Sequence, residues 1–162
     1  MRIRDLMTKQ VASVRSADSS AVAARLMWDC DCGAVPVIDD DGRAIAVVTD
    51  RDICMAALMR DRAPSAIPVA EVMSRDLKSC GPDDEVATAE EIMRAHQIRR
   101  LPIVDRDRRP VGMLSLADIV RATDSKKGRS SREVAPEEVA VTLADICAPP
   151  ARDVSPPAPP AF

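Results

Sequence analysis

Apolar and polar positions along the chain follow one pattern twice. When the sequence is shifted by 66 positions, it matches itself without a gap from about residue 3 to residue 54. Met7 then falls on Met73 and Pro36 on Pro102, and apolar positions agree where identities differ. A chance match would not keep register and residue class over about fifty positions, so the chain contains a duplicated unit.

Each copy predicts the order strand, helix, strand, strand, helix, which is an α+β (α/β two-layer) unit. The strands are short apolar runs, expected at 11–14, 34–38 and 44–48 in the first copy and at 77–80, 101–104 and 111–114 in the second. The second and third runs of each copy flank charged turn residues, and this spacing predicts a hairpin. Pro36 and Pro102 cannot donate a ladder hydrogen bond, so we expect both at a sheet edge.

Two helices complete each copy. The first follows Asp18 or Asp84, which we expect to be its N-cap, and the second begins at Thr49 or Ser115. A unit of about 50–60 residues buries little apolar surface by itself. We therefore expect the two copies to pack sheet to sheet around one core, related by pseudo-two-fold symmetry.

The duplication also sets the domain boundaries. The first copy is expected over residues 1–66 and the second over residues 67–122, while residues 123–162 follow a different pattern. The short segment 61–68 would link the copies and keep them together.

The C-terminal part predicts a connector, one helix and a tail. Residues 123–133 are polar and indicate a flexible connector, whereas Pro136 and two acids open a helix expected over 136–147. The apolar stripe of this helix is Val139, Leu143 and Ile146. We expect the helix to dock on the body or on a second subunit, and the Pro-rich tail from Pro149 to be disordered.

Composition and charge narrow the class of protein. The 162 residues carry a net charge of −3 with 23 basic and 26 acidic side chains well mixed, so we expect no nucleic-acid partner. No apolar run approaches the roughly 20 residues of a membrane span, and the first residues do not resemble a signal peptide. We therefore expect a cytoplasmic protein, without a membrane partner, whose five cysteines are reduced.

Two strings after the hairpins carry a family resemblance. They are residues 46–52 (AVVTDRD) and residues 112–118 (GMLSLAD). Both resemble the CBS (cystathionine-β-synthase-type) signature, which is a small residue, two apolar residues, Thr or Ser, any two residues and Asp. With the repeat around them, residues 2–122 are similar to two tandem CBS repeats, a Bateman module. The chain looks most like small bacterial proteins that consist of such a pair.

The resemblance implies a regulatory, ligand-sensing module and not an enzyme. It implies an adenosine nucleotide (AMP, ADP or ATP) as ligand in the cleft between the repeats, and a homodimer or an unknown partner protein that receives the signal. In the family, the signature hydroxyl contacts phosphate or ribose, and the signature Asp holds the ribose hydroxyls. These roles fall on Thr49, Asp52, Ser115 and Asp118.

The same four residues also have a purely structural interpretation. A hydroxyl followed three residues later by a carboxylate matches a helix capping box. The two interpretations are compatible, because a capped helix that starts directly after a strand offers free N–H groups and a positive dipole end to an anion.

Positive charge for a phosphate is expected from Arg99 and Arg100. The resemblance places phosphate-contacting residues there, and the alternative is a solvated charged turn. The first copy has Gly33 and Ala34 at these positions, with Arg51 as the available cation. The base would lie against apolar walls and backbone groups. The candidate wall residues are Val11, Val14, Val35, Pro36, Leu101 and Pro102.

Two departures from the family pattern bear on the site. Ala46 replaces the usual Gly of the first copy and would add a methyl group where the backbone approaches a ligand. Arg108, Arg109 and Pro110 replace the usual Asp-Gly turn, a change that we expect to affect only the hairpin.

Two other functions stay open. A structural or partner-binding protein with vestigial pockets is favoured by Ala46 and by the uncharged Gly33. A metal- or redox-responsive protein would use Cys30, Cys32 and His96, although Cys-x-Cys spacing is poor for zinc. The remaining cysteines, Cys54, Cys80 and Cys147, are expected to be small core residues. No Ser/His/Asp set or Gly-rich phosphate loop indicates catalysis.

Overall fold

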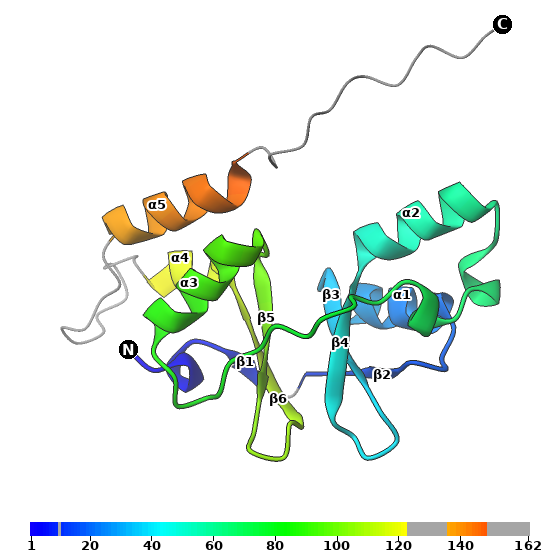
Figure 1. Ribbon diagram of the computed structural model, residues 1–162, viewed down its shortest axis with the longest axis horizontal. Helices are drawn as coiled ribbons and strands as arrows, with labels where there is room; N and C mark the ends of the chain where they lie inside the picture. Colours follow the sequence, from blue (N-terminus) through cyan, green and yellow to red (C-terminus); the bar gives the residue numbers. More distant parts are fainter. Residues whose placement is uncertain (10, 123–135, 149–162) are drawn as a thin grey trace, which may run out of the picture.

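The computed structural model describes residues 1–9, 11–122 and 136–148. Two small sheets face each other, and the helices lie on their outer sides (Figure 1). Across the first sheet the strands are β2 (Val14–Arg15), β3 (Ala34–Ile38) and β4 (Ala44–Thr49). Across the second they are β1 (Thr8–Lys9), β6 (Pro110–Ser115) and β5 (Arg100–Val104). The predicted mixed α and β architecture with two tandem repeats is confirmed.

The helices follow the predicted order. They are α1 (Ser20–Asp29), α2 (Asp50–Arg60), α3 (Val86–His96), α4 (Leu116–Ala122) and α5 (Pro136–Cys147). Short 3-10 turns precede β1 at Ile3–Asp5 and lie between α2 and α3 at Pro64–Ala66 and Val69–Glu71. No helix within the described ranges has the length and apolar character that a membrane crossing requires.

The two hairpins repeat each other in detail. β3 and β4 are antiparallel, as are β5 and β6, and each ladder shifts register near the turn. In each turn one carboxylate oxygen accepts from two backbone N–H groups, at Asp39 in the first copy and at Asp105 in the second. The charged turn residues therefore close the hairpins, as their spacing predicts.

The leading segment of each repeat packs on the other repeat. The N–H of Ile3 donates to the Asp84 carbonyl at 3.0 Å, and the N–H of Val69 donates to the Asp18 carbonyl at 2.8 Å. Ile3 is fully buried in the core of the second repeat, whereas Val69 is fully buried in the core of the first. β1 likewise pairs with β6. Each of the two cores thus contains residues from both copies. This packing holds the two repeats together in addition to the covalent linker between them.

The predicted N-caps are wrong by one residue. The N-caps of α1 and α3 are Ser19 and Glu85, and neither side chain makes a capping hydrogen bond. The carboxylate of Asp18 instead accepts from the Arg15 N–H at 2.8 Å, and Asp84 does the same to Gly81 at 2.7 Å. A short Asp side chain can accept a hydrogen bond from a nearby turn as readily as from a helix N-terminus. Here both carboxylates accept from the turn that precedes the helix.

Three strand predictions also need correction. Pro36 lies in β3, the central strand of its sheet, so the prediction that it lies at a sheet edge is wrong. On that side of β3, strand β2 pairs only with the two residues after Pro36, Val37 and Ile38. The expected leading strands are shorter than predicted: β2 begins at Val14, and the second copy keeps only a parallel bridge between Cys80 and Ile103. Pro102 lies in β5, an edge strand of its sheet, as predicted, and its carbonyl oxygen accepts from the Cys80 N–H at 3.3 Å.

The C-terminal helix α5 has its predicted bounds and packs on the second repeat beside α3 and α4 (Figure 1). Its inward face is Val139, Thr142 and Ile146, all buried. Leu143, expected in the stripe, is 43% exposed because it lies one position off this face. The predicted connector and tail lie outside the described residues.

The cysteines were predicted as core residues in three places, and one of these predictions holds. Cys80 is buried in the second core, and burial raises the pKa of its thiol to about 11. Cys54 and Cys147 are exposed. Cys54 lies on α2 and Cys147 at the end of α5, and both face away from the cores in which they were predicted.

Candidate ligand site between the repeats

The two repeats and α5 border a cleft of about 890 Å³. This volume lies in the range typical of small-molecule sites. The first repeat and its neighbouring segments contribute Thr8, Val11, Ala12, Cys30, Asp31, Cys32, Gly33, Ala34, Val35 and Asp50. The second repeat contributes Arg99, Arg100, Met113, Ser115, Leu116, Ala117, Asp118, Val120 and Arg121, and α5 contributes Leu143. The cleft therefore joins a mainly apolar wall to a small number of charged and hydroxyl groups.

A capping box stands at the start of the last helix of each repeat. In the second repeat the Ser115 hydroxyl donates to Asp118 Oδ2 at 2.6 Å and accepts from the Asp118 N–H at 3.2 Å. Thr49 and Asp52 form the same pair in the first repeat, at the same 2.6 Å and 3.2 Å. The structural interpretation of this spacing is confirmed. It orients each carboxylate, because one of its oxygens is held by the backbone N–H and the hydroxyl.

Three arginines bring positive charge to the cleft from the second repeat. Arg121 pairs with Asp118 Oδ1. Neither Arg99 nor Arg100 forms an ion pair or side-chain hydrogen bond with any residue that the structure describes. Two guanidinium groups are thus available to an anion in the cleft.

Arg100 reaches across the cleft to the first repeat. A Cβ atom placed on Gly33 would lie 3.1 Å from Arg100 Nη2 and 2.9 Å from Asp50 Oδ2. Gly33 therefore leaves the space in which a cation of one repeat and a carboxylate of the other converge. A side chain at this position would fill that space.

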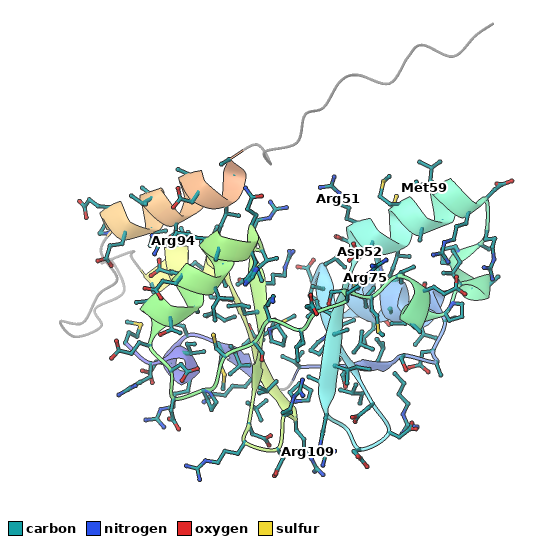
Figure 2. All side chains as sticks on the ribbon, viewed as in Figure 1. Arg51, Asp52, Met59, Arg75, Arg94 and Arg109 are labelled. Carbon is teal, nitrogen blue, oxygen red and sulfur yellow. The ribbon has the colours of Figure 1, made fainter. Side chains whose placement is uncertain are left out.

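Six of the predicted site residues line this cleft. They are Val11, Val35, Arg99, Arg100, Ser115 and Asp118. Seven others lie outside its lining: Val14, Pro36, Thr49, Arg51, Asp52, Leu101 and Pro102. Val14 and Leu101 are buried in the two cores, and Arg51 extends away from the body at the start of α2 (Figure 2).

Sequence reasoning missed several residues of the cleft. Asp31 and Asp50 follow α1 and β4 in the first repeat, and Arg121 lies one turn after the signature Asp118. Their charge and their place beside the signature could have indicated them. Leu143 could not have been found, because only the tertiary packing of α5 brings it to the cleft.

The signature glycine does not face the cleft. Gly112 pairs with Lys9 in β1, and a Cβ atom there would meet the Met7 sulfur at 2.5 Å and the Thr8 carbonyl oxygen at 3.0 Å. Its counterpart Ala46 is fully buried in the first core. The expectation that Ala46 adds a methyl group toward a ligand is therefore wrong, since this side chain lies in the core and does not line the cleft.

The turn of the second hairpin also does more than expected. The N–H of Ala44 in the first repeat donates to the Arg108 carbonyl oxygen at 2.8 Å. The substituted turn therefore contacts the other repeat and is not confined to its own hairpin.

The structure brings only two of the three residues of the proposed cysteine site to the cleft. Cys30 and Cys32 both line the cleft, and partial desolvation raises the pKa of the Cys32 thiol. Cys30, Cys32 and His96 do not come together as a metal-holding group: in the described part of the chain no three His, Cys, Asp or Glu side chains do so.

Comparison with known proteins identifies the family. The family model described as CBS domain matches the chain twice, over residues 3–59 and residues 69–125. The chain belongs to the CBS domain family. The two matches cover the two repeats, so the chain holds a CBS pair, which is a regulatory module.

Relatives of similar size share this CBS pair. CBS domain-containing protein YhcV of Bacillus subtilis is 40% identical over 117 residues, which are 72% of this chain and 81% of that protein. Hypoxic response protein 1 of Mycobacterium tuberculosis is 30% identical over 118 residues, 73% of this chain and 82% of that protein.

Solved CBS structures agree with the fold. A crystal structure of Hypoxic Response Protein I with two coordinated zinc ions has a TM-score of 0.68 at 30% identity, covering 75% of this chain and 98% of that one. The CBS domain pair of protein MJ0100 was solved in complex with 5′-methylthioadenosine and S-adenosyl-L-methionine. It has a TM-score of 0.68 at 26% identity and the same coverage of both chains.

Proposed function

We propose that this CBS pair is a sensor that binds an adenosine nucleotide in the cleft between its repeats. The observation that carries the proposal is a pair of guanidinium groups, Arg99 and Arg100, which have no ion-pair partner among the described residues and lie in one cleft with the oriented carboxylate of Asp118. Guanidinium groups bind phosphate oxygens in bidentate fashion, and a fixed carboxylate can accept hydrogen bonds from a ribose diol.

The rest of the cleft suits a nucleoside. Its walls at Val11, Val35 and Met113 are apolar and can cover the faces of a base, while backbone groups between them can meet its edge. The solved complex of MJ0100 with two adenosine compounds supports the same ligand class.

The signalling part of the proposal rests on α5. Leu143 lines the cleft, while Val139 and Ile146 of the same helix lie in the second core. A ligand in the cleft would therefore contact α5, which is docked on the second repeat. A change in the position of α5 on ligand binding would then transmit the signal to a partner.

The experiment compares two matched carboxylates. Asp118→Ala and Asp52→Ala each remove one capping box, so both should lower the stability of the fold by about 1 kcal/mol. Only Asp118 lines the cleft. We expect Asp118→Ala to weaken AMP, ADP or ATP binding by about 1–3 kcal/mol in calorimetry, roughly five- to 150-fold, and Asp52→Ala to change it less than twofold.

Three results would contradict the proposal. Equal losses in both variants would mean that the effect is structural. Failure of AMP, ADP, ATP and S-adenosylmethionine to bind the unaltered chain would favour a structural or partner-binding protein with vestigial pockets. A response to zinc alone would favour the cysteine site.

We also propose that the protein is a homodimer formed by packing of CBS pairs. The outer surface of the first repeat carries large apolar side chains on α1 and α2. They are Trp28, Leu58 and Met59, which are 83%, 73% and 79% exposed. Large exposed apolar side chains on neighbouring helices are typical of a protein interface.

A further inference from the structure

We propose that the cleft selects its ligand by charge, accepting an adenosine ligand with one phosphate group and rejecting a triphosphate. The residues that select are Asp31 and Asp50 of the first repeat. This inference rests on the proposed nucleotide-binding function and adds the ligand class.

The charges of the cleft are balanced between its two sides. The three cations Arg99, Arg100 and Arg121 come from the second repeat. The three carboxylates are Asp31 and Asp50 from the first repeat and Asp118 from the second, so the formal charges of the lining cancel. A cleft that held three or four phosphate charges would need a clear excess of cations.

One ion pair within the second repeat leaves net positive charge on that side of the cleft and net negative charge on the side of the first repeat. Arg121 and Asp118 neutralise each other. Arg99 and Arg100 then face a ligand with two positive charges, which match one phosphate group. Asp31 and Asp50 form no ion pair with any residue that the structure describes. No described cation therefore offsets their negative charge toward the cleft.

The geometry at Gly33 places the opposing charges close together. Asp50 Oδ2 and Arg100 Nη2 lie within 2.9 Å and 3.1 Å of the same point above Gly33. Figure 1 shows the starts of β3, α2 and β5 on the same side of the two sheets. A phosphate bound to Arg100 thus has the Asp50 carboxylate as a near neighbour, and a chain of further phosphates extends toward negative charge.

Elementary electrostatics gives the size of the effect. At roughly 7 Å and an effective dielectric constant of 40–80, one carboxylate weakens the binding of each additional unit charge by about three- to sevenfold. Two carboxylates therefore disfavour the extra charges of a triphosphate by roughly tenfold or more. Added salt screens this repulsion, with a Debye length of about 10 Å at 0.1 M.

The experiment measures the ratio of AMP to ATP affinity by calorimetry on the full chain, with EDTA present. The variants are Asp31→Asn, Asp50→Asn and the double variant. Asp31 has a φ of 47°, and Asn tolerates this left-handed backbone, so the fold is preserved. Asp40→Asn is the matched control, because its carboxylate is fully exposed on the β3–β4 hairpin and does not line the cleft.

We expect the unaltered chain to bind AMP at least tenfold more tightly than ATP at low salt, and less selectively at 0.5 M salt. The double variant should bind ATP about tenfold or more better, with AMP affinity changed less, while Asp40→Asn keeps the original ratio. An unchanged ratio in the double variant would overturn the inference, as would ATP binding as tightly as AMP to the unaltered chain.

Two further outcomes separate this inference from the proposed function. If neither AMP nor ATP nor S-adenosylmethionine binds, the proposed function itself fails. Tight ATP binding that requires Mg²⁺ and is lost in the double variant would overturn only the inference, because the two aspartates would then serve a cation.

Discussion

At the scale of single residues, the two copies keep the same backbone where their side chains differ. Gly42 in the first hairpin has a φ of 78°, and Arg108 at the equivalent position has a φ of 64°. This left-handed conformation costs nothing at glycine and about 1–2 kcal/mol at other residues. The hydrogen bond from Ala44 to the Arg108 carbonyl helps to hold it. Pro110, equivalent to Ala44, has no N–H, so the reciprocal bond to Gly42 cannot form.

Replacing Arg108 by glycine is therefore expected to stabilise the protein. The relief of the left-handed strain exceeds the roughly 0.5–1 kcal/mol of chain entropy that glycine costs, so the free energy of unfolding should rise by about 0.5–1 kcal/mol. Urea denaturation measures it. Arg106→Gly is the control: it removes the same charge from the same turn where φ is not positive, and should destabilise. Equal losses in the two variants would disprove the strain.

At the scale of elements, the contact between α3 and α5 contains a buried carboxylate. Glu90 of α3 is 5% exposed and accepts a hydrogen bond from the Thr142 hydroxyl of α5 at 3.3 Å. Desolvation raises the pKa of Glu90, and Glu138 raises it further, while Thr142 and Arg94 lower it. Arg94 lies on α3 on the side of α5 (Figure 2). The docking of the C-terminal helix is thus less favourable when Glu90 is ionised.

The sign of the pH dependence follows from this direction. Because the folded pKa of Glu90 exceeds its unfolded value, its contribution to stability is present below the unfolded pKa and is lost as the pH rises through the folded pKa. Glu90→Gln should therefore stabilise the protein at pH 8, by about 1 kcal/mol, with the difference vanishing near pH 4. Denaturation at a series of pH values tests this. Glu91→Gln, exposed on the same helix, should show no such pH-dependent gain.

At the scale of the whole molecule, the outer faces of the two repeats differ. On the second repeat α5 packs over α3 and α4, whereas the equivalent helices α1 and α2 of the first repeat have no such cover within the described chain (Figure 1). Figure 2 shows Met59 pointing outward from α2. A second subunit on this face would bury apolar surface that the monomer leaves in water.

Leu58→Glu is expected to separate the proposed dimer. Placing a charge in an apolar interface should raise the dissociation constant at least tenfold, or about 1.4 kcal/mol, as measured by analytical ultracentrifugation. Val141→Glu is the control, because Val141 is 52% exposed on α5 of the other repeat. A dimer that survives Leu58→Glu but is lost in Val141→Glu would place the interface on the second repeat. A monomer at all concentrations would refute the dimer.

The sequence by itself determined the local structure and the family. The duplication, the hairpins, the capping boxes at Thr49 and Ser115 and the bounds of α5 all follow from patterns within a few residues, because turns, caps and periodic apolar faces are set by near neighbours in the chain. The signature strings indicated the family, and Arg99, Arg100, Ser115 and Asp118, predicted for one site, all line the cleft.

Only the tertiary structure decided which partners those residues have. The leading segment of each repeat packs on the other repeat, which puts Ile3 into the second core and places Gly112 beside Met7. Nothing local in the sequence distinguishes this arrangement from one in which each leading segment packs on its own repeat. The same applies to Leu143 and Asp50, which reach the cleft because separate elements converge there. Local patterns fix the elements, but contacts between distant segments depend on how apolar faces and close backbone approaches fit across the whole molecule.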